Sequence, residues 1–225
     1  LLKKKITELP LRGRRVFINA GPTVEPIDPV RYISNYSSGR MGIAIADMAA
    51  RLGADVTLVL GPVTVLPQEK SVTVVPVKTA AEMKEASVKA FGVCEIAILA
   101  AAVADFTPET PSATKVKRGD DDLVIRLKPT DDIAACLGKM KRTGQFLAGF
   151  ALETDNEMEN AMGKLRRKNL DMIILNSLKD QGAGFGYDTN RVTIIDRNNN
   201  IDKFELKTKD EVASDILEKI ISLTR

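Results

Sequence analysis

The sequence predicts an α/β protein with a doubly wound, Rossmann-like sheet that is mostly parallel and has helices on both faces. Two observations carry this prediction. Five short apolar runs alternate along the chain with five segments of helical periodicity. Most of these runs are continuous rather than alternating with polar residues, which is typical of parallel strands because both of their faces are buried.

The strands are expected at residues 16–20, 56–60, 96–101, 146–150 and 172–175, and the helices at 42–51, 80–91, 133–140, 157–168 and 211–223. After a Gly-rich loop at 181–190, two runs at 192–196 and 203–206 alternate in polarity around an Asn-rich turn. They predict an antiparallel hairpin at the sheet edge. The polar segment at 106–130 interrupts the pattern and is expected to form a hairpin or flap.

Composition narrows the class of protein. With 225 residues, 44% of them hydrophobic, the chain can bury one substantial core. Its net charge of +3 is too small to favour nucleic acid or a membrane surface, and no apolar run reaches the roughly 18 residues of a membrane span. Two cysteines without metal-ligand spacing suit a reducing compartment, so we expect a cytoplasmic protein. Residues 1–12 are interpreted as a linker remnant and 13–225 as the domain.

Histidine is absent from the chain. This excludes Ser–His nucleophiles, His-ligated metals and the usual general base. Any chemistry must depend on positioning, and on charge from Lys, Arg, Asn, Asp and main-chain amides.

The loop at 21–42, GPTVEPIDPVRYISNYSSGRMG, lies where a dinucleotide-binding protein would have a tight glycine turn. Its Ser37, Ser38 and Gly39 lead into the first helix, whose free amides offer an anion site. The structural alternative is plain N-capping by Ser38.

Arg31 and Asn35 lie just upstream of these serines. If 30–35 forms a helical turn, the two side chains share a face and could bind a phosphate or carboxylate together. A solvated surface turn explains the pair equally well.

Small residues follow the third strand at its carboxyl end, where open α/β sheets bind ligands. Ala100 and Ala101 would let a ligand approach the main chain, although tight packing also explains them. Asp105 follows directly and could contact magnesium or a sugar. Further on, Lys115 belongs to a cationic stretch that could equally be a solvated charge run.

Three further features could contribute to a nucleotide site. The junction at 129–133 is a strong helix start with anion-binding amides. Phe150 ends a strand and could stack on a base or simply belong to the core. Lys164 and Lys168 project together near a helix end, where lysines also favour the helix dipole without any ligand.

The order of these motifs closely resembles bacterial phosphopantothenoylcysteine synthetase, the phosphopantothenate–cysteine ligase of coenzyme A biosynthesis. The resemblance extends from about residue 14 to the C-terminus. It is carried by GPTxEPIDPVRYISNxSSGxMG at 21–42, AAAVADF at 100–106, Lys-Val-Lys at 115–117, GFALET at 149–154 and the Lys-x3-Lys pair at 164 and 168.

The resemblance implies a two-step ligation that needs magnesium. The carboxylate of 4'-phosphopantothenate attacks the α-phosphate of CTP to give an acyl-cytidylate and pyrophosphate, and the amine of cysteine then displaces CMP. It also implies a homodimer whose flap, around Lys115, reaches the interface, and native fusion to a flavin-dependent decarboxylase half.

The resemblance assigns roles by motif match. Asn35 would hold the acyl-cytidylate, Arg31 would orient phosphopantothenate, and Lys115 would stabilise charge at the α-phosphate. The nucleotide site would consist of Ser37, Ser38, Gly39, Ala100, Ala101, Asp105, Lys115, Asp131, Asp132, Ile133, Ala134, Phe150, Lys164 and Lys168, with Asp105 as the candidate metal ligand.

Two other classes of function remain open. One is a nucleotide-binding module without catalysis, although binding alone would not require Asn35. The other is an NAD(P)-dependent reductase with a modified loop. The second strand counts against the reductase, because it ends in Leu60-Gly61-Pro62 rather than in the acidic residue that binds a ribose hydroxyl.

Overall fold

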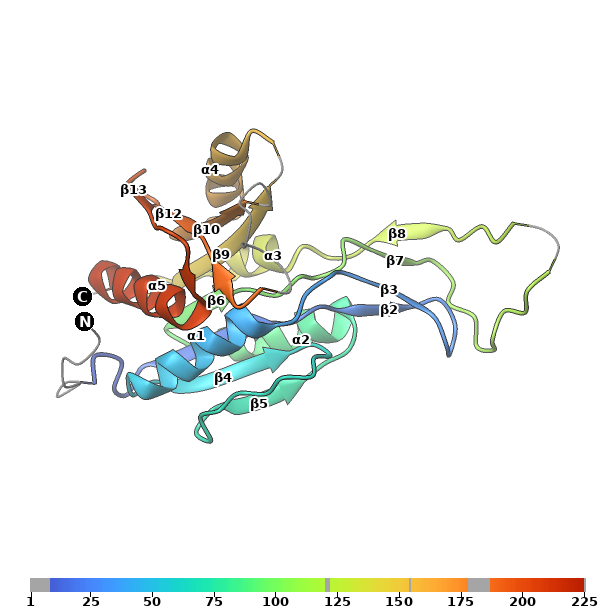
Figure 1. The fold of residues 1–225 in the computed structure, drawn as a ribbon, viewed down its shortest axis with the longest axis horizontal. Coiled ribbons are helices and arrows are strands. Elements are labelled where there is room, and N and C mark those ends of the chain that lie inside the picture. Colours follow the sequence, from blue (N-terminus) through green and yellow to red (C-terminus); the bar gives the residue numbers. More distant parts are fainter. Residues whose placement is uncertain (1–8, 120–121, 154, 178–186, 225) are drawn as a thin grey trace.

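A computed structural model describes residues 9–119, 122–153, 155–177 and 187–224. A central eight-stranded sheet organises the molecule (Figure 1). From one edge to the other its strands are β5 (Thr73–Pro76), β4 (Asp55–Leu60), β1 (Arg15–Ala20), β6 (Ile96–Leu99), β9 (Phe146–Glu153), β10 (Met172–Ser177), β12 (Val192–Asp196) and β13 (Ile201–Lys203). The first six are parallel to one another, and the last two form an antiparallel hairpin. The predicted fold class and edge hairpin are therefore confirmed.

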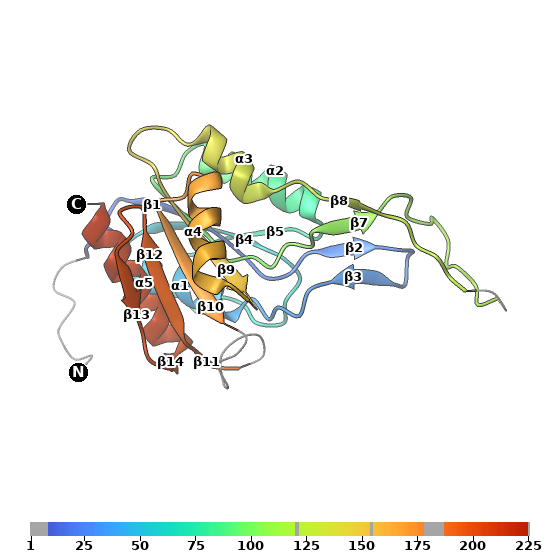
Figure 2. The same cartoon turned by 90° about the horizontal axis from the view of Figure 1, so that it is seen from above.

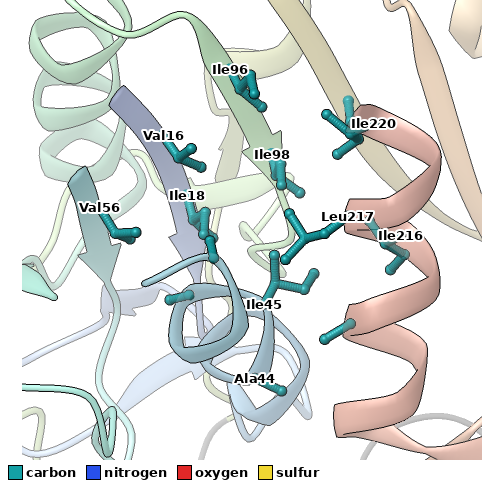
Figure 3. Packing of buried hydrophobic residues seen from close by; sticks show 14 of the residues in the cluster. Val16, Ile18, Ala44, Ile45, Val56, Ile96, Ile98, Ile216, Leu217 and Ile220 are labelled. Atoms are coloured by element: carbon teal, nitrogen blue, oxygen red, sulfur yellow. The ribbon is translucent and has the colours of Figure 1, made fainter. Parts of the chain in front are cut away.

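Helices cover both faces of the sheet. On one face α1 (Arg40–Arg51) packs beside α5 (Lys209–Leu223), and on the other face lie α2 (Ala80–Phe91), α3 (Ile133–Met140) and α4 (Glu157–Arg167) (Figure 2). Neighbouring strand residues point to opposite faces: Val16 and Ile18 face α1 and α5, whereas Phe17 faces the other helices. Figure 3 shows Ile45 and Leu217 meeting over the central strands.

The chain order creates a topological switch point beside β1. From β1 the chain runs outward through α1 to β4 and β5, and it then returns through α2 to β6 on the other side of β1. The loops that leave β1 and β6 therefore diverge at the carboxyl edge of the sheet. Open α/β sheets bind their ligands at such a point.

An extended arm projects from this edge, and its outer part extends beyond the helices (Figures 1 and 2). At its base Glu25 accepts a hydrogen bond from the Ala80 N–H, at the start of α2, at 2.8 Å. The arm consists of two short antiparallel ribbons, β2 (Val24–Pro26) with β3 (Tyr32–Ser34) and β7 (Phe106–Pro108) with β8 (Leu127–Pro129). The hairpin predicted for 106–130 is thus present. A last small ribbon pairs β11 (Thr189–Asn190) with β14 (Lys207–Thr208) next to the start of α5.

Some local predictions were wrong. The conditional helical turn at 30–35 is strand β3, so Arg31 and Asn35 do not share a helix face. Helix α1 begins at Arg40 rather than residue 42, and β13 spans Ile201–Lys203 rather than 203–206. Leu11, assigned to the linker, is 1% exposed within the core, and its N–H donates to Leu52 O at 3.0 Å.

Two further points concern the predicted Gly-rich loop and the length of the helices. The Gly-rich loop falls mostly on 178–186, outside the described residues. In the part of the chain that the structure describes, no helix combines the length and the apolar character needed to cross a membrane.

Candidate functional site

Two adjacent hollows open at the carboxyl edge of the sheet. The first, which we call the α1 lobe, has a volume of about 390 Å³ and lies between the N-terminus of α1, residues 100–102 and the ends of β9 and β10. The second, the α3 lobe, has a volume of about 320 Å³ and lies beside the N-terminus of α3 and the C-terminal end of α4. Their shared wall consists of Ala101, Ala102, Asp105, Phe150 and Leu152.

This cleft brings together all the predicted site residues except Arg31 and Lys115. The α1 lobe is lined by Asn35, Ser37, Ser38, Gly39 and Ala100, the α3 lobe by Asp131, Asp132, Ile133, Ala134, Lys164 and Lys168, and both by Ala101, Asp105 and Phe150. These residues come from five separate segments of the chain, and the fold brings them together although they are far apart in the sequence.

The N-terminus of α1 is open toward the α1 lobe. Its N-cap is Gly39, whose φ of 71° lies in the left-handed region that glycine tolerates best, and no side chain caps the helix. Capping by Ser38, the structural alternative, is therefore absent. The Gly39 N–H donates to Ser37 Oγ at 3.3 Å, and the amides of the first turn from Arg40 onward remain available for an anion. Gly42 lets the helix approach the sheet, since a Cβ there would lie 2.4 Å from Ala20 Cβ.

Asn35 joins the two loops that diverge at the switch point. Its Nδ2 donates to Ala102 O at 3.2 Å and to Val103 O at 3.0 Å. The side chain is thus held across the mouth of the α1 lobe, where its Oδ1 can still accept a hydrogen bond. Deeper in, the buried Asn19 accepts a hydrogen bond from the Ala101 amide at 3.1 Å and fixes the floor shared with the α3 lobe.

Asp132 occupies the helix start in the α3 lobe. Its Oδ1 accepts the Ala135 N–H at 2.9 Å, and its Oδ2 lies 2.9 Å from Lys168 Nζ. Burial opposes ionisation of this carboxyl, but the amide hydrogen bonds and Lys168 outweigh burial and lower the pKa of Asp132. The negative charge therefore persists at neutral pH beside the amides predicted to hold phosphate.

The cations of the α3 lobe are paired with carboxylates. Lys164 Nζ lies 2.7 Å from Glu153 Oε1, and Lys168 Nζ lies 2.9 Å from Asp132 Oδ2. Lys84, on α2, pairs with Asp131 at 2.9 Å. A polyanion that binds in this lobe would therefore have to replace these carboxylates as the ion-pair partners of the lysines.

Arg31 lies outside both lobes, at a third hollow of about 640 Å³ beside the arm. Its guanidinium contacts Asp28 Oδ2 at 2.5 Å and donates to Val116 O at 2.7 Å. The Val116 N–H in turn donates to Asp28 at 3.1 Å. The hydrogen bond from Arg31 is the main cause of a strongly lowered Asp28 pKa. In this structure Arg31 therefore ties the segment at 116 to the β2–β3 hairpin. Lys115 is exposed on that same segment.

Four polar residues of the α1 lobe were not predicted from the sequence. Lys209 begins α5 and is 8% exposed, Asn190 ends β11 and is 2% exposed, and Asn176 lies near the end of β10. Arg40 is the first residue of α1. Asn176 could have been predicted as a site residue, because it directly follows the apolar run at 172–175 on the carboxyl side of a parallel strand.

Asp105 is exposed in the wall between the lobes, where it can reach a ligand in either one. Among the described residues there is no group of three or more acidic, Cys or His side chains that could hold a metal ion. One carboxylate still suits magnesium, which usually takes one or two protein carboxylates together with substrate phosphates and water.

The switch-point cleft and its arm define an α/β protein with a candidate ligand site at the carboxyl edge of its sheet. Residues 11–223 match the family described as the DNA/pantothenate metabolism flavoprotein C-terminal domain, and the chain belongs to this family.

Relatives agree over nearly the whole chain. It is 72% identical over 221 residues to a cysteine/cysteine sulfinic acid decarboxylase from an unknown prokaryotic organism, covering 98% of this chain and 62% of that protein. It is 43% identical over 219 residues to the coenzyme A biosynthesis bifunctional protein CoaBC of Bacillus subtilis (strain 168), covering 97% of this chain and 54% of that protein. The chain thus spans between half and two thirds of these relatives' length.

A solved structure supports the same relationship. The crystal structure of the C-terminal domain of a coenzyme A biosynthesis bifunctional protein CoaBC superposes with a TM-score of 0.82 at 42% identity. The match covers 96% of this chain and 98% of that one. The predicted family and fold are therefore confirmed together.

Proposed function

We propose that this chain is the ligase that joins 4'-phosphopantothenate to L-cysteine with CTP, in coenzyme A biosynthesis. The observation that carries the proposal is the two-lobed cleft, in which Asp105 lies in the shared wall, Asn35 lies at the mouth of the α1 lobe, and each lobe has basic side chains and a helix N-terminus. A cleft of this kind can hold a nucleotide and an anionic acyl substrate with their reacting groups at the shared wall. Membership of the family and the similarity to CoaBC support the same reaction.

The reaction proceeds in two displacements. A carboxylate oxygen of phosphopantothenate attacks the α-phosphorus of CTP, and the bond to the β-phosphate breaks with release of pyrophosphate. The amine of cysteine then attacks the acyl carbon, CMP leaves with the bonding electrons, and the amine loses a proton as the amide forms. No histidine is needed, because the acyl-phosphate anhydride supplies the leaving group and alignment supplies much of the rate.

Each residue of the cleft is assigned a role from its position. Asn35 holds the acyl group across the mouth of the α1 lobe, while Lys164, Lys168 and the amides of α3 neutralise nucleotide phosphates. Phe150 offers a ring for the base at the shared wall. Asp105 would hold magnesium, which supplies positive charge at the phosphates when bound.

Lys115 and the arm complete the proposal. Because Lys115 lies outside both lobes of its own chain, we infer that it acts on the α-phosphate in a partner subunit of a homodimer. We further propose that the natural protein is cytoplasmic and carries a flavin-dependent decarboxylase half, since the chain spans 54% of its CoaBC relative.

Pyrophosphate release tests the function directly. The purified protein is given magnesium and phosphopantothenate with CTP or ATP, with and without cysteine. Release with CTP that becomes sustained turnover when cysteine is added supports the ligase. Nucleotide binding without any release would favour a non-catalytic module, and tight NADPH binding would favour the reductase.

A further inference from the structure

The segment of the arm that carries Lys115 is attached at two points. Within 111–119 every residue is exposed except Ser112 and Val116. Among the described residues, these two make the hydrogen bonds that join the segment to the rest of the chain. The Ser112 N–H donates to Ile27 O at 2.9 Å, and Val116 contacts two residues of the same loop, between β2 and β3. The position of Lys115 therefore depends on that loop.

Both main-chain groups of Val116 are bound. Its N–H donates to Asp28 Oδ2 at 3.1 Å, and its carbonyl accepts a hydrogen bond from the Arg31 guanidinium at 2.7 Å. A peptide unit is planar and includes the Cα atom on either side of it. The hydrogen bond to Asp28 therefore orients the peptide plane that begins at the Lys115 Cα.

The two carboxylate oxygens of Asp28 have different partners. Oδ1 accepts the N–H groups of Val30 and Arg31, each at 2.8 Å, and so shapes its own loop. Oδ2 accepts the Val116 N–H and the Arg31 guanidinium, whose Nη2 lies at 2.5 Å. The side chain is 0% exposed, and the hydrogen bonds from Arg31 and the amides keep its pKa far below the usual value. One oxygen thus holds the loop, and the other holds the lysine segment.

Lys115 needs a defined position if it acts on the α-phosphate. Its charge lowers the barrier only where it meets the charge that develops there, and a misplacement of about 1 Å can cost about a hundredfold in rate. The residues at 113–119 form no helix or strand that could fix the lysine. The alignment of Lys115 must therefore come from the contacts of Val116.

We propose that Asp28 is a positioning residue for the first step of the reaction, and that it places Lys115 by holding the Val116 N–H. This inference rests on the proposed function and deepens it. Asp28 lies outside both lobes of the cleft, so it reaches the α-phosphate only through Lys115. Its loss should lower the rate of activation and leave the affinity for CTP unchanged.

The substitution Asp28→Asn separates the two duties of this side chain. Asparagine retains Oδ1 for the loop amides, but its Nδ2 is a donor and cannot accept from Val116 or Arg31. Pyrophosphate release is followed in a single turnover, with the protein in excess over CTP and with magnesium and phosphopantothenate present. The rate should fall by about tenfold to a hundredfold, while the Kd for CTP stays within about twofold.

A double variant distinguishes positioning from a merely structural role. In Lys115→Gln, adding Asp28→Asn should have almost no further effect, because the group that Asp28 positions is already absent. The matched control is Asp196→Asn. Asp196 is 1% exposed and accepts the N–H groups of Asn198 and Asn200 in the turn between β12 and β13. The control should lower stability and leave the rate unchanged. An unchanged rate in Asp28→Asn, or an equal loss with and without Lys115→Gln, overturns the assignment.

Hydrogen exchange separates this inference from the proposed function. In peptides that cover 112–118 of the wild type, the Val116 amide should be protected. Asp28→Asn should remove this protection, and Asp196→Asn should not. Equally fast exchange in the wild type and in Asp28→Asn would overturn the inference whether or not the protein is a ligase. A wild type that shows the protection but releases no pyrophosphate would count against the ligase alone.

Discussion

In the proposed reaction, Asn35 is expected to be the residue on which the second step depends most directly. In Asn35→Asp, we expect pyrophosphate to be released while acyl-cytidylate accumulates, because the side chain that holds the acyl group now carries a negative charge. Quenched reactions separated by chromatography measure the intermediate. Asn198→Asp, in the turn between β12 and β13, is the matched control. Normal product formation by Asn35→Asp would remove Asn35 from this role.

Lys168 is expected to act on the nucleotide rather than on the acyl substrate. In Lys168→Ala the KM for CTP should rise about tenfold, since a phosphate-binding cation is lost and Asp132 is left without its partner beside the α3 amides. Steady-state kinetics with CTP varied measures the change, and Lys89→Ala serves as the control. An unchanged KM would place the triphosphate elsewhere.

Individual residues show which parts of the candidate site could be predicted from the sequence. Ser37, Asp105 and Lys168 could be proposed as site residues because each lies at a strand end or a helix end in the expected pattern. Lys209 and Asn190 could not, because β11 and α5 are brought to the α1 lobe by tertiary contacts: the pairing of β11 with β14 and the packing of α5 on α1. The hydrogen bond from Arg31 to Val116 O could not be predicted either, because the two residues are 85 positions apart in the sequence.

Helix α1 depends on its close approach to β1. In Gly42→Ala the added Cβ would meet Ala20 Cβ at 2.4 Å, so the helix must shift and stability should fall by about 1–3 kcal/mol. Gly163→Ala, in the middle of α4, is the matched substitution. Its Cβ would meet only the end of the flexible Arg167 side chain, and it should stabilise the protein by about 0.5–1 kcal/mol. Urea unfolding of both variants measures the difference, and similar losses would contradict the close-packing argument.

The base of the arm is expected to respond to acid. Arg31 and three main-chain amides hold the pKa of Asp28 well below its value of about 3.9 in an unfolded chain. This stabilisation is therefore complete above about pH 4 and is lost as the pH falls toward the lowered pKa. In Asp28→Asn it should be missing at neutral pH as well.

Thermal unfolding of Asp28→Asn and the wild type at neutral pH and at about pH 3 measures this effect. The gap in Tm between the two proteins should shrink at the lower pH. A gap that stays constant would mean that Asp28 contributes no charge-dependent stability.

The elements that could be predicted share one property: their pattern is local. Continuous apolar runs predicted five of the six parallel strands. β5 was missed because it is a half-exposed edge strand, Thr-Val-Val-Pro, that ends in proline. The ribbon of β2 with β3 was missed because a three-residue strand is defined by its partner, and the same segment in isolation also suits a turn.

At the scale of the whole molecule, the position of Lys115 predicts sharing of active sites between subunits. Asn35→Asp and Lys115→Gln are each expected to form little product alone. If Lys115 acts in the partner's cleft, every mixed dimer contains one intact site. An equal mixture should then recover about a quarter of wild-type activity, since about half of the dimers are mixed and half of their sites are intact.

Product formation after the two variants are mixed and re-associated measures this recovery. Native mass spectrometry of the mixture, with one variant isotopically labelled, verifies that subunits exchange. If exchange occurs and activity is not recovered, Lys115 acts within its own chain, and the arm must fold back toward the cleft.

The wall shared by the two lobes has a consequence for how the substrates bind. Ala101, Asp105 and Phe150 face both hollows, so a ligand seated in one lobe becomes part of the surface that the other ligand meets. Occupancy of the two lobes is then thermodynamically linked, and the linkage is reciprocal. By whatever factor CTP changes the affinity for phosphopantothenate, phosphopantothenate must change the affinity for CTP.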